Sequence, residues 1–78
     1  MPNYMEMKRI MRKEIQAVVN EAGKVDLTKL IAERCLKTGF TEKTVAKVLS
    51  QMEELGYIKI EDNIVYAPAT YRAEKVDE

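Results

Sequence analysis

The chain has 78 residues, 46% of them hydrophobic, which is enough for one small globular domain with a core of limited size. It contains 13 basic and 13 acidic residues, no histidine, and a single cysteine, Cys35. Zinc fingers, Cys–His nucleophile pairs and intrachain disulfides are therefore excluded. Because the cysteine content suits a reducing compartment and the N-terminus lacks a signal-peptide pattern, we expect a soluble cytoplasmic protein.

The charges are unevenly distributed along the chain. Residues 1–50 hold ten Lys/Arg and six Asp/Glu, whereas residues 51–78 hold three and seven. A formal net charge of zero therefore conceals a basic first part and an acidic last part. Such a distribution bears on binding partners rather than on the fold.

The first half of the chain predicts two helices. Apolar residues recur at three- and four-residue spacing over residues 5–22, and Gly23 follows as a C-terminal cap. After one or two extended residues, Asp26 is suited to be the N-cap of a second helix over residues 27–37. That helix is expected to bury its apolar side chains, namely Leu27, Leu30, Ile31 and Cys35.

The clearest element is a third helix over residues 42–55, with Thr41 as its N-cap and Gly56 just beyond its end. Its apolar side chains fall within an arc of roughly 120° on a helical wheel. They are Val45, Val48, Leu49, Met52 and Leu55. This arc should face the core, which leaves the opposite side of the helix in solvent.

Two short runs rich in β-branched and aromatic residues, 57–60 and 64–67, follow the third helix. The turn-forming residues Glu61-Asp62-Asn63 join them, which predicts a β-hairpin that ends at Pro68. Residues 69–78 form either a flexible arm or a short further helix.

The segment VDLTKLIAERCLKTGFTEKTVAKVLSQMEELGYIKIEDNIVYA, residues 25–67, together with the helix before it, resembles the winged helix-turn-helix family. In that family the second and third helices form the helix-turn-helix, the third helix reads the DNA major groove, and the hairpin is the wing. The resemblance implies an α+β, helix-rich domain over residues 1–68, with three helices and a C-terminal hairpin. It also implies a small transcriptional regulator that binds double-stranded DNA, most similar to those of archaea and their viruses and plasmids. Because the same fold also serves as a protein-docking module, an adaptor within a larger complex is the alternative.

The outward side of the third helix is the candidate DNA-reading surface. Its polar side chains suit contacts to phosphates and base edges, and they are Thr41, Lys43, Thr44, Lys47, Ser50 and Gln51. The acidic Glu53 and Glu54 stand at the C-terminal end, where they oppose the helix dipole without local benefit. A solvated helix face of mixed polarity is the competing interpretation, and the absence of arginine on this face favours it.

Basic residues elsewhere extend the candidate interface. Arg9, Arg12 and Lys13 share one side of the first helix and could meet phosphates, although a solvated charged face fits them equally well. In the hairpin only Lys59 is basic, and the acidic tip indicates a structural hairpin or one that faces a protein partner.

The chain begins with a methionine-rich apolar stripe, formed by Met1, Tyr4, Met5, Met7 and Met11. The stripe predicts a homodimer contact through the first helix, with a frayed chain start as the alternative. No carboxylate pair, glycine-rich phosphate loop or nucleophile–base set is recognisable, so we expect neither catalysis nor a cofactor, and no metal site.

Overall fold

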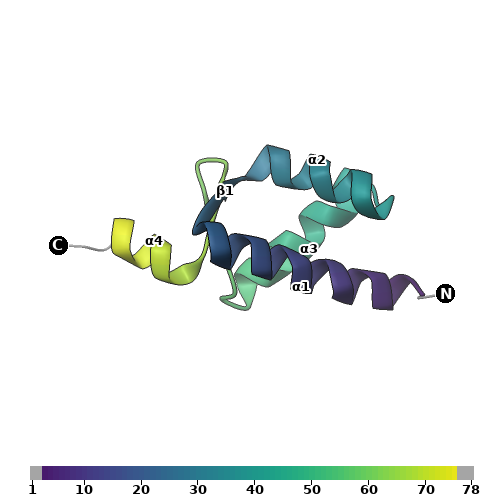
Figure 1. Cartoon of the computed structure of the whole chain (residues 1–78), viewed down its shortest axis with the longest axis horizontal. Helices are drawn as coiled ribbons and strands as arrows, with labels where there is room; N and C mark the ends of the chain where they lie inside the picture. The colour runs from purple at the N-terminus through teal and green to yellow at the C-terminus, as the bar shows by residue number, and fades with distance from the viewer. Residues whose placement is uncertain (1–2, 76–78) are drawn as a thin grey trace.

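The computed structural model describes residues 3–75, which form four helices and a three-stranded antiparallel sheet (Figure 1). The predicted α+β, helix-rich class is confirmed. The molecule is elongated, with principal extents of 48 × 20 × 19 Å. Helix α1 lies along the long axis, and the two ends of the chain lie at opposite ends of the molecule (Figure 1).

Helix α1 comprises Tyr4–Ala22 and agrees with the predicted first helix. Asn3 caps its start, because the side-chain oxygen accepts a hydrogen bond from the Glu6 N–H at 2.8 Å. Its core-facing side chains lie four residues apart, as the predicted amphipathic pattern requires. They are Met11, Ile15 and Val19.

Helix α2 comprises Leu27–Thr38, and the predicted N-cap Asp26 accepts the Lys29 N–H at 2.9 Å. The preceding extended segment is longer than expected. It forms a full strand, β1 (Lys24–Asp26), because it pairs antiparallel with β3 (Ile64–Tyr66). This pairing could not be expected from a local pattern, since forty residues or so separate the two strands.

Helix α3 comprises Glu42–Glu54 and begins at the predicted N-cap Thr41. Four of the five side chains in the predicted apolar arc are buried. The prediction for the fifth, Leu55, was wrong: its side chain is 67% exposed. Leu55 is the C-terminal cap rather than part of the helix, and at Gly56 the chain turns away with a φ of 84°.

The hairpin consists of β2 (Lys59–Glu61) and β3. The first strand starts two residues later than predicted, whereas the second starts at residue 64 as predicted and ends one residue earlier. The turn between them is shorter than predicted. Glu61 belongs to β2, and only Asp62 and Asn63 make the turn, with φ angles of 54° and 63°. Two residues with positive φ are the signature of a type I′ turn, which Asp and Asn tolerate well. The register then places Glu61 opposite Ile64.

The hairpin tip is held against the start of α2. The Leu27 N–H donates to the Asn63 carbonyl oxygen at 2.9 Å, and the Thr28 hydroxyl donates to the Asn63 side-chain oxygen at 3.1 Å. The hairpin therefore does not project freely from the domain.

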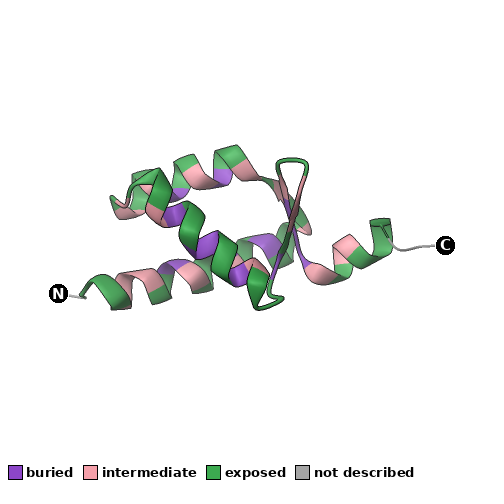
Figure 2. Cartoon of the chain, turned by 180° about the vertical axis from the view of Figure 1, so that it is seen from behind, coloured by how far each residue is buried: buried purple, intermediate pink, exposed green. Residues whose placement is uncertain are grey.

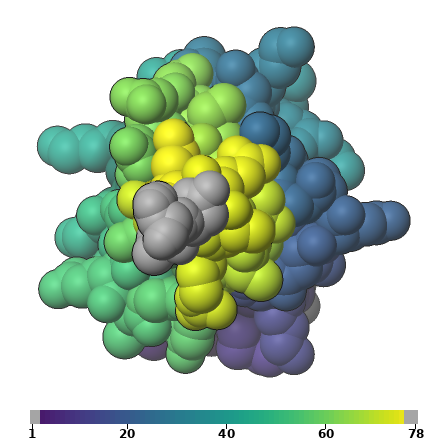
Figure 3. Space-filling model, turned by 90° about the vertical axis from the view of Figure 1, so that its left-hand side faces the viewer, coloured from purple at the N-terminus to yellow at the C-terminus, as the bar shows by residue number. Residues whose placement is uncertain are grey.

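The C-terminal segment forms helix α4 (Pro68–Lys75). Of the two alternatives predicted for the tail, a flexible arm or a short helix, the structure therefore has the helix up to Lys75. Residues 76–78 lie outside the described part. The helix starts at Pro68, so it crosses the predicted domain boundary. Tyr71 packs edge-to-face on Tyr66 with ring centroids 5.4 Å apart. The Lys24 ammonium lies 3.1 Å from a Glu74 carboxylate oxygen. Seen from this end of the molecule, α4 lies over the hairpin (Figure 3).

The core lies where α1, α2 and α3 meet one face of the sheet, and buried residues mark the inner sides of these elements (Figure 2). Among the described residues, one buried side chain is charged. Arg34 on α2 is only 3% exposed, and its Nη1 donates to a Glu14 carboxylate oxygen at 2.7 Å. Leu27 and Ile31, which were predicted to be buried, are only partly buried, as is Cys35. Helix α2 instead buries Arg34, which is not one of the apolar residues predicted to face the core.

Candidate nucleic-acid interface

The outward side of α3 is exposed as predicted. Lys43, Lys47, Ser50 and Gln51 are all exposed, and so is Ala46 between them. Within residues 3–75, neither lysine has a carboxylate within ion-pair distance. Both ammonium groups are therefore available to an anion from outside.

Thr41 and Thr44, at the start of α3, contact each other. The Thr41 hydroxyl accepts the Thr44 N–H at 3.2 Å, and the two hydroxyl oxygens lie 3.1 Å apart. This is the N-cap of α3. Thr44 is partly buried, so the cap positions the helix more than it offers free hydroxyls.

The two acidic residues at the C-terminal end of α3 differ in their surroundings. The expectation that both bring no local benefit was wrong for Glu53, whose carboxylate accepts the Ile60 N–H at 2.9 Å. This hydrogen bond ties the end of α3 to β2. Glu54 is exposed and makes no such contact within the described residues. The basic character of the face therefore resides in the N-terminal half of α3.

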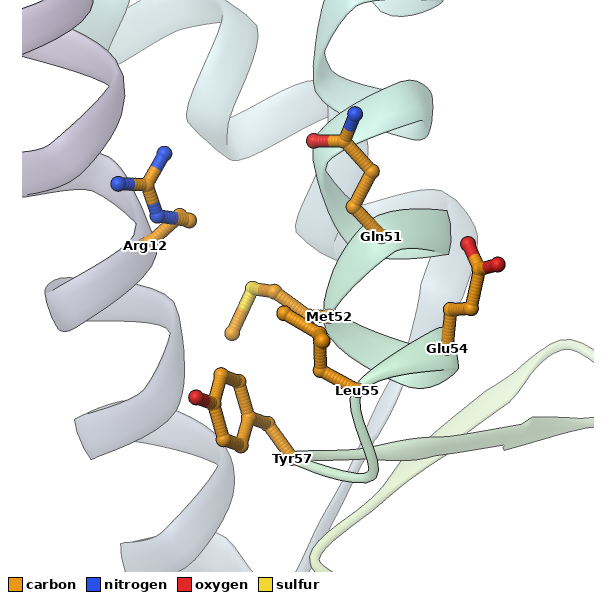
Figure 4. A pocket seen from close by; sticks show the side chains of 6 residues that line it. All are labelled: Arg12, Gln51, Met52, Glu54, Leu55 and Tyr57. Carbon is orange, nitrogen blue, oxygen red and sulfur yellow. The ribbon is translucent and has the colours of Figure 1, made fainter.

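The cations of α1 lie beside the other half of α3. Arg9, Arg12 and Lys13 line a hollow of about 250 Å³ against Met52 and Tyr57. Arg12 also borders a second hollow, of about 470 Å³, together with Gln51 and Leu55 (Figure 4). The structure thus brings Arg12 and Gln51 together. Arg9 forms an ion pair with Glu6 on its own helix, whereas phosphate contact by any of the three stays a prediction.

Lys59 is not brought to this face. Its ammonium nitrogen lies 5.3 Å from the centre of the Tyr71 ring, so the side chain is held under α4 on the sheet. The Glu61 carboxylate near Tyr71 raises the pKa of that phenol, because it favours the protonated hydroxyl over the negatively charged phenolate.

The methionine-rich stripe is only partly available for a dimer contact. Met11 belongs to the core, whereas Met5 is 76% exposed. Tyr4 packs edge-to-face on Phe40 with ring centroids 5.3 Å apart, and Met1 lies outside the described residues. Ile10, further along α1, is also exposed. A dimer through α1 stays a prediction.

Among residues 3–75, no three His, Cys, Asp or Glu side chains are grouped closely enough to hold a metal ion. Over the same range, no helix is both long and apolar enough to cross a membrane.

Comparison of the chain with protein-family models, with curated proteins and with solved structures finds no match to any of them.

Proposed function

We propose that the protein is a winged helix-turn-helix protein that binds double-stranded DNA and regulates transcription, with α3 in the major groove. The order of elements supports the proposal, because β1 separates α1 from α2 and a hairpin follows α3. The observation that carries it is a pair of exposed lysines on the N-terminal half of α3, Lys43 and Lys47, which form no ion pair within residues 3–75. In groove-reading helices it is that half that enters the groove.

Each side chain of this face has a role that its chemistry supports. Lys43 and Lys47 lie one turn apart on the same side of α3 and bind successive phosphate oxygens along one edge of the groove. Ala46 has only a methyl group, so the helix backbone can approach a thymine methyl closely. Ser50 and Gln51 carry hydrogen-bonding groups that can reach base edges, and Gln suits the two-point contact with adenine.

The hairpin adds little to DNA binding in this proposal. Its tip carries Asp62 and is fastened to α2 through Asn63. An acidic tip repels phosphate, and a tip bound to α2 is not free to enter a minor groove. Binding therefore depends on α3, and a small number of phosphate contacts gives a shallow salt dependence.

The test is titration of labelled duplexes by fluorescence anisotropy at two salt concentrations. Lys43→Ala and Lys47→Ala should each weaken binding to every sequence and lower the salt slope by about one unit. Ser50→Ala should relax specificity at one base position at a cost of ~1–3 kcal/mol and leave the salt slope alone. Lys29→Ala, which removes an exposed lysine from α2, is the matched control and should bind as the wild type does.

The proposal fails if the double variant of Lys43 and Lys47 keeps the wild-type affinity for every duplex. Circular dichroism of the double variant guards against a trivial loss of fold. Both side chains are exposed, so the fold should be retained.

A further inference from the structure

Two adjoining hollows lie between α1 and the C-terminal end of α3. They share Arg12, Met52 and Tyr57 in their walls, and together they are here called the α1–α3 groove. Its remaining wall residues include Lys13 on α1 and Leu55 at the end of α3. It lies at the opposite end of α3 from Lys43, and its chemistry differs from that of the lysine-bearing face.

The floor of the groove is apolar and uncovered. Leu55 is 67% exposed and Tyr57 is 52% exposed, and both point toward the buried Met52 between the two helices (Figure 4). Within residues 3–75 no other segment covers the two side chains. Single exposed apolar side chains are common on protein surfaces, but here two lie side by side on a hollow, so they offer an apolar surface to another molecule.

The floor is also held in place before any partner arrives. The Tyr57 N–H donates to the Met52 carbonyl oxygen at 2.9 Å, and the Tyr57 carbonyl oxygen accepts the Gln16 side-chain amide at 2.9 Å. These bonds connect the end of α3 to α1 across the groove. A site that is already ordered costs a ligand less conformational entropy on binding.

One wall of the groove is cationic. Arg12 and Lys13 project from α1, and in the described part of the chain neither has a carboxylate within ion-pair distance. Glu54 borders the groove on the other side, but its carboxylate points away from the hollow (Figure 4). The groove therefore combines an apolar floor with unneutralised positive charge along one side.

We propose that the α1–α3 groove binds an acidic amphipathic segment of another protein. An apolar side chain of that segment packs between Leu55 and Tyr57, and its carboxylates pair with Arg12 and Lys13. Helix-in-groove recognition works in this way, with apolar anchors supplying affinity and flanking charges setting orientation. A DNA backbone is a poorer occupant, because phosphates gain nothing from Leu55 and Tyr57.

A second copy of the chain fits less well. The groove would have to receive a different surface of its neighbour, since it is itself basic rather than acidic. Such a head-to-tail contact does not close on a pair, so it requires a ring of subunits or continues as an open chain. A separate acidic partner satisfies the groove without that consequence.

The experiment uses the full chain and two phage-displayed peptide libraries. In one library a central Leu or Phe is flanked by positions restricted to Asp, Glu and small residues, and in the other Lys replaces the acids. The acidic library should yield enriched binders and the basic library none. Enriched peptides are then titrated as free, labelled peptides against variants of the protein.

Leu55→Ser should weaken peptide binding about tenfold, because it removes a largely buried leucine from the complex. Arg12→Gln and Lys13→Gln should each weaken it about two- to fivefold and flatten its dependence on salt. Leu36→Ser and Lys37→Gln on α2 are the matched controls and should leave binding unchanged, since Leu36 is 88% exposed and Lys37 is exposed as well.

Several results overturn the proposal. One is the absence of enrichment from the acidic library over the basic one, and another is binding that survives Leu55→Ser. If Arg12→Gln and Lys13→Gln each lower duplex affinity and the salt slope, the groove is a DNA contact instead. If Leu55→Ser abolishes self-association in sedimentation without peptide, the occupant is a second copy. The Lys43→Ala variant separates the two proposals, because Lys43 lies outside the groove. Its effect on duplex binding bears only on the DNA-binding proposal, and it should leave peptide binding unchanged.

Discussion

Arg34 on α2 forms a buried ion pair with Glu14 on α1. We therefore expect Glu14 to contribute more to stability than its half-exposed side chain suggests. Arg34 is 3% exposed, and its Nε has no hydrogen-bond partner within the described residues. Its guanidinium depends on Glu14, at 2.7 Å, and more weakly on Glu33, at 3.8 Å. Glu14→Gln would leave a buried positive charge without its principal counter-charge.

The expected magnitude follows from this geometry. Removal of one partner from a fully buried ion pair costs roughly 3–5 kcal/mol. The Glu14 side chain is 55% exposed, so water screens the pair, and the Glu33 carboxylate remains after the substitution. We therefore expect Glu14→Gln to lower the free energy of unfolding by about 1–3 kcal/mol. Arg34→Met should stay within ~1 kcal/mol of the wild type, because an apolar residue of similar length fills the site and the Glu14 carboxylate returns to water.

The assay is urea unfolding followed by circular dichroism at neutral pH. Glu21→Gln is the matched control, since Glu21 is an exposed glutamate of the same helix that forms no ion pair within residues 3–75. In a double-variant cycle, Arg34→Met should recover most of the stability that Glu14→Gln loses. The reasoning is refuted if Glu14→Gln costs no more than Glu21→Gln, or if Arg34→Met is the more damaging of the two.

Three further predictions follow from the packing. Leu49→Ala should lower the free energy of unfolding by ~2–5 kcal/mol, because Leu49 is 1% exposed in the core; an unchanged urea midpoint would contradict that placement. Gly23→Ala should cost ~1–2 kcal/mol, because Gly23 has a φ of 84° and a Cβ there would lie 3.1 Å from the Thr70 hydroxyl oxygen; thermal unfolding at equal or higher temperature would contradict it. If α1 forms the predicted dimer, deletion of residues 1–7 should weaken self-association in sedimentation, whereas a wild-type monomer at high micromolar concentration rules the dimer out.

The elements whose signals are local were predicted well. The caps at Asp26 and Thr41 bind N–H groups only three residues away, so the side chain and its target are both visible in a short stretch of sequence. The burial of Val45 and Leu49 follows in the same way from helical spacing. The order of helices, and the hairpin after them, could therefore be derived without tertiary information.

The candidate DNA-reading face was predictable for the same reason. Once the buried side of α3 is known from its spacing, the opposite side is fixed, and Lys43 and Lys47 have to be exposed. Lys59 was harder to place. Its exposure on a strand follows from alternation, but its position under Tyr71 depends on α4, which the sequence offered only as one of two possibilities.

By itself, then, the sequence determined the first three helices, the N-caps at Asp26 and Thr41 and most of the inward face of α3, since each depends on residues within one or two turns of each other. Tertiary structure alone decided that Arg34 is buried against α1, where it meets Glu14. It also placed Arg12 and Gln51 on the two sides of one hollow, and held the hairpin tip against α2 through Asn63. These outcomes depend on contacts between segments far apart in the chain, where the geometry of packing sets the neighbours and spacing along the sequence carries no information about them.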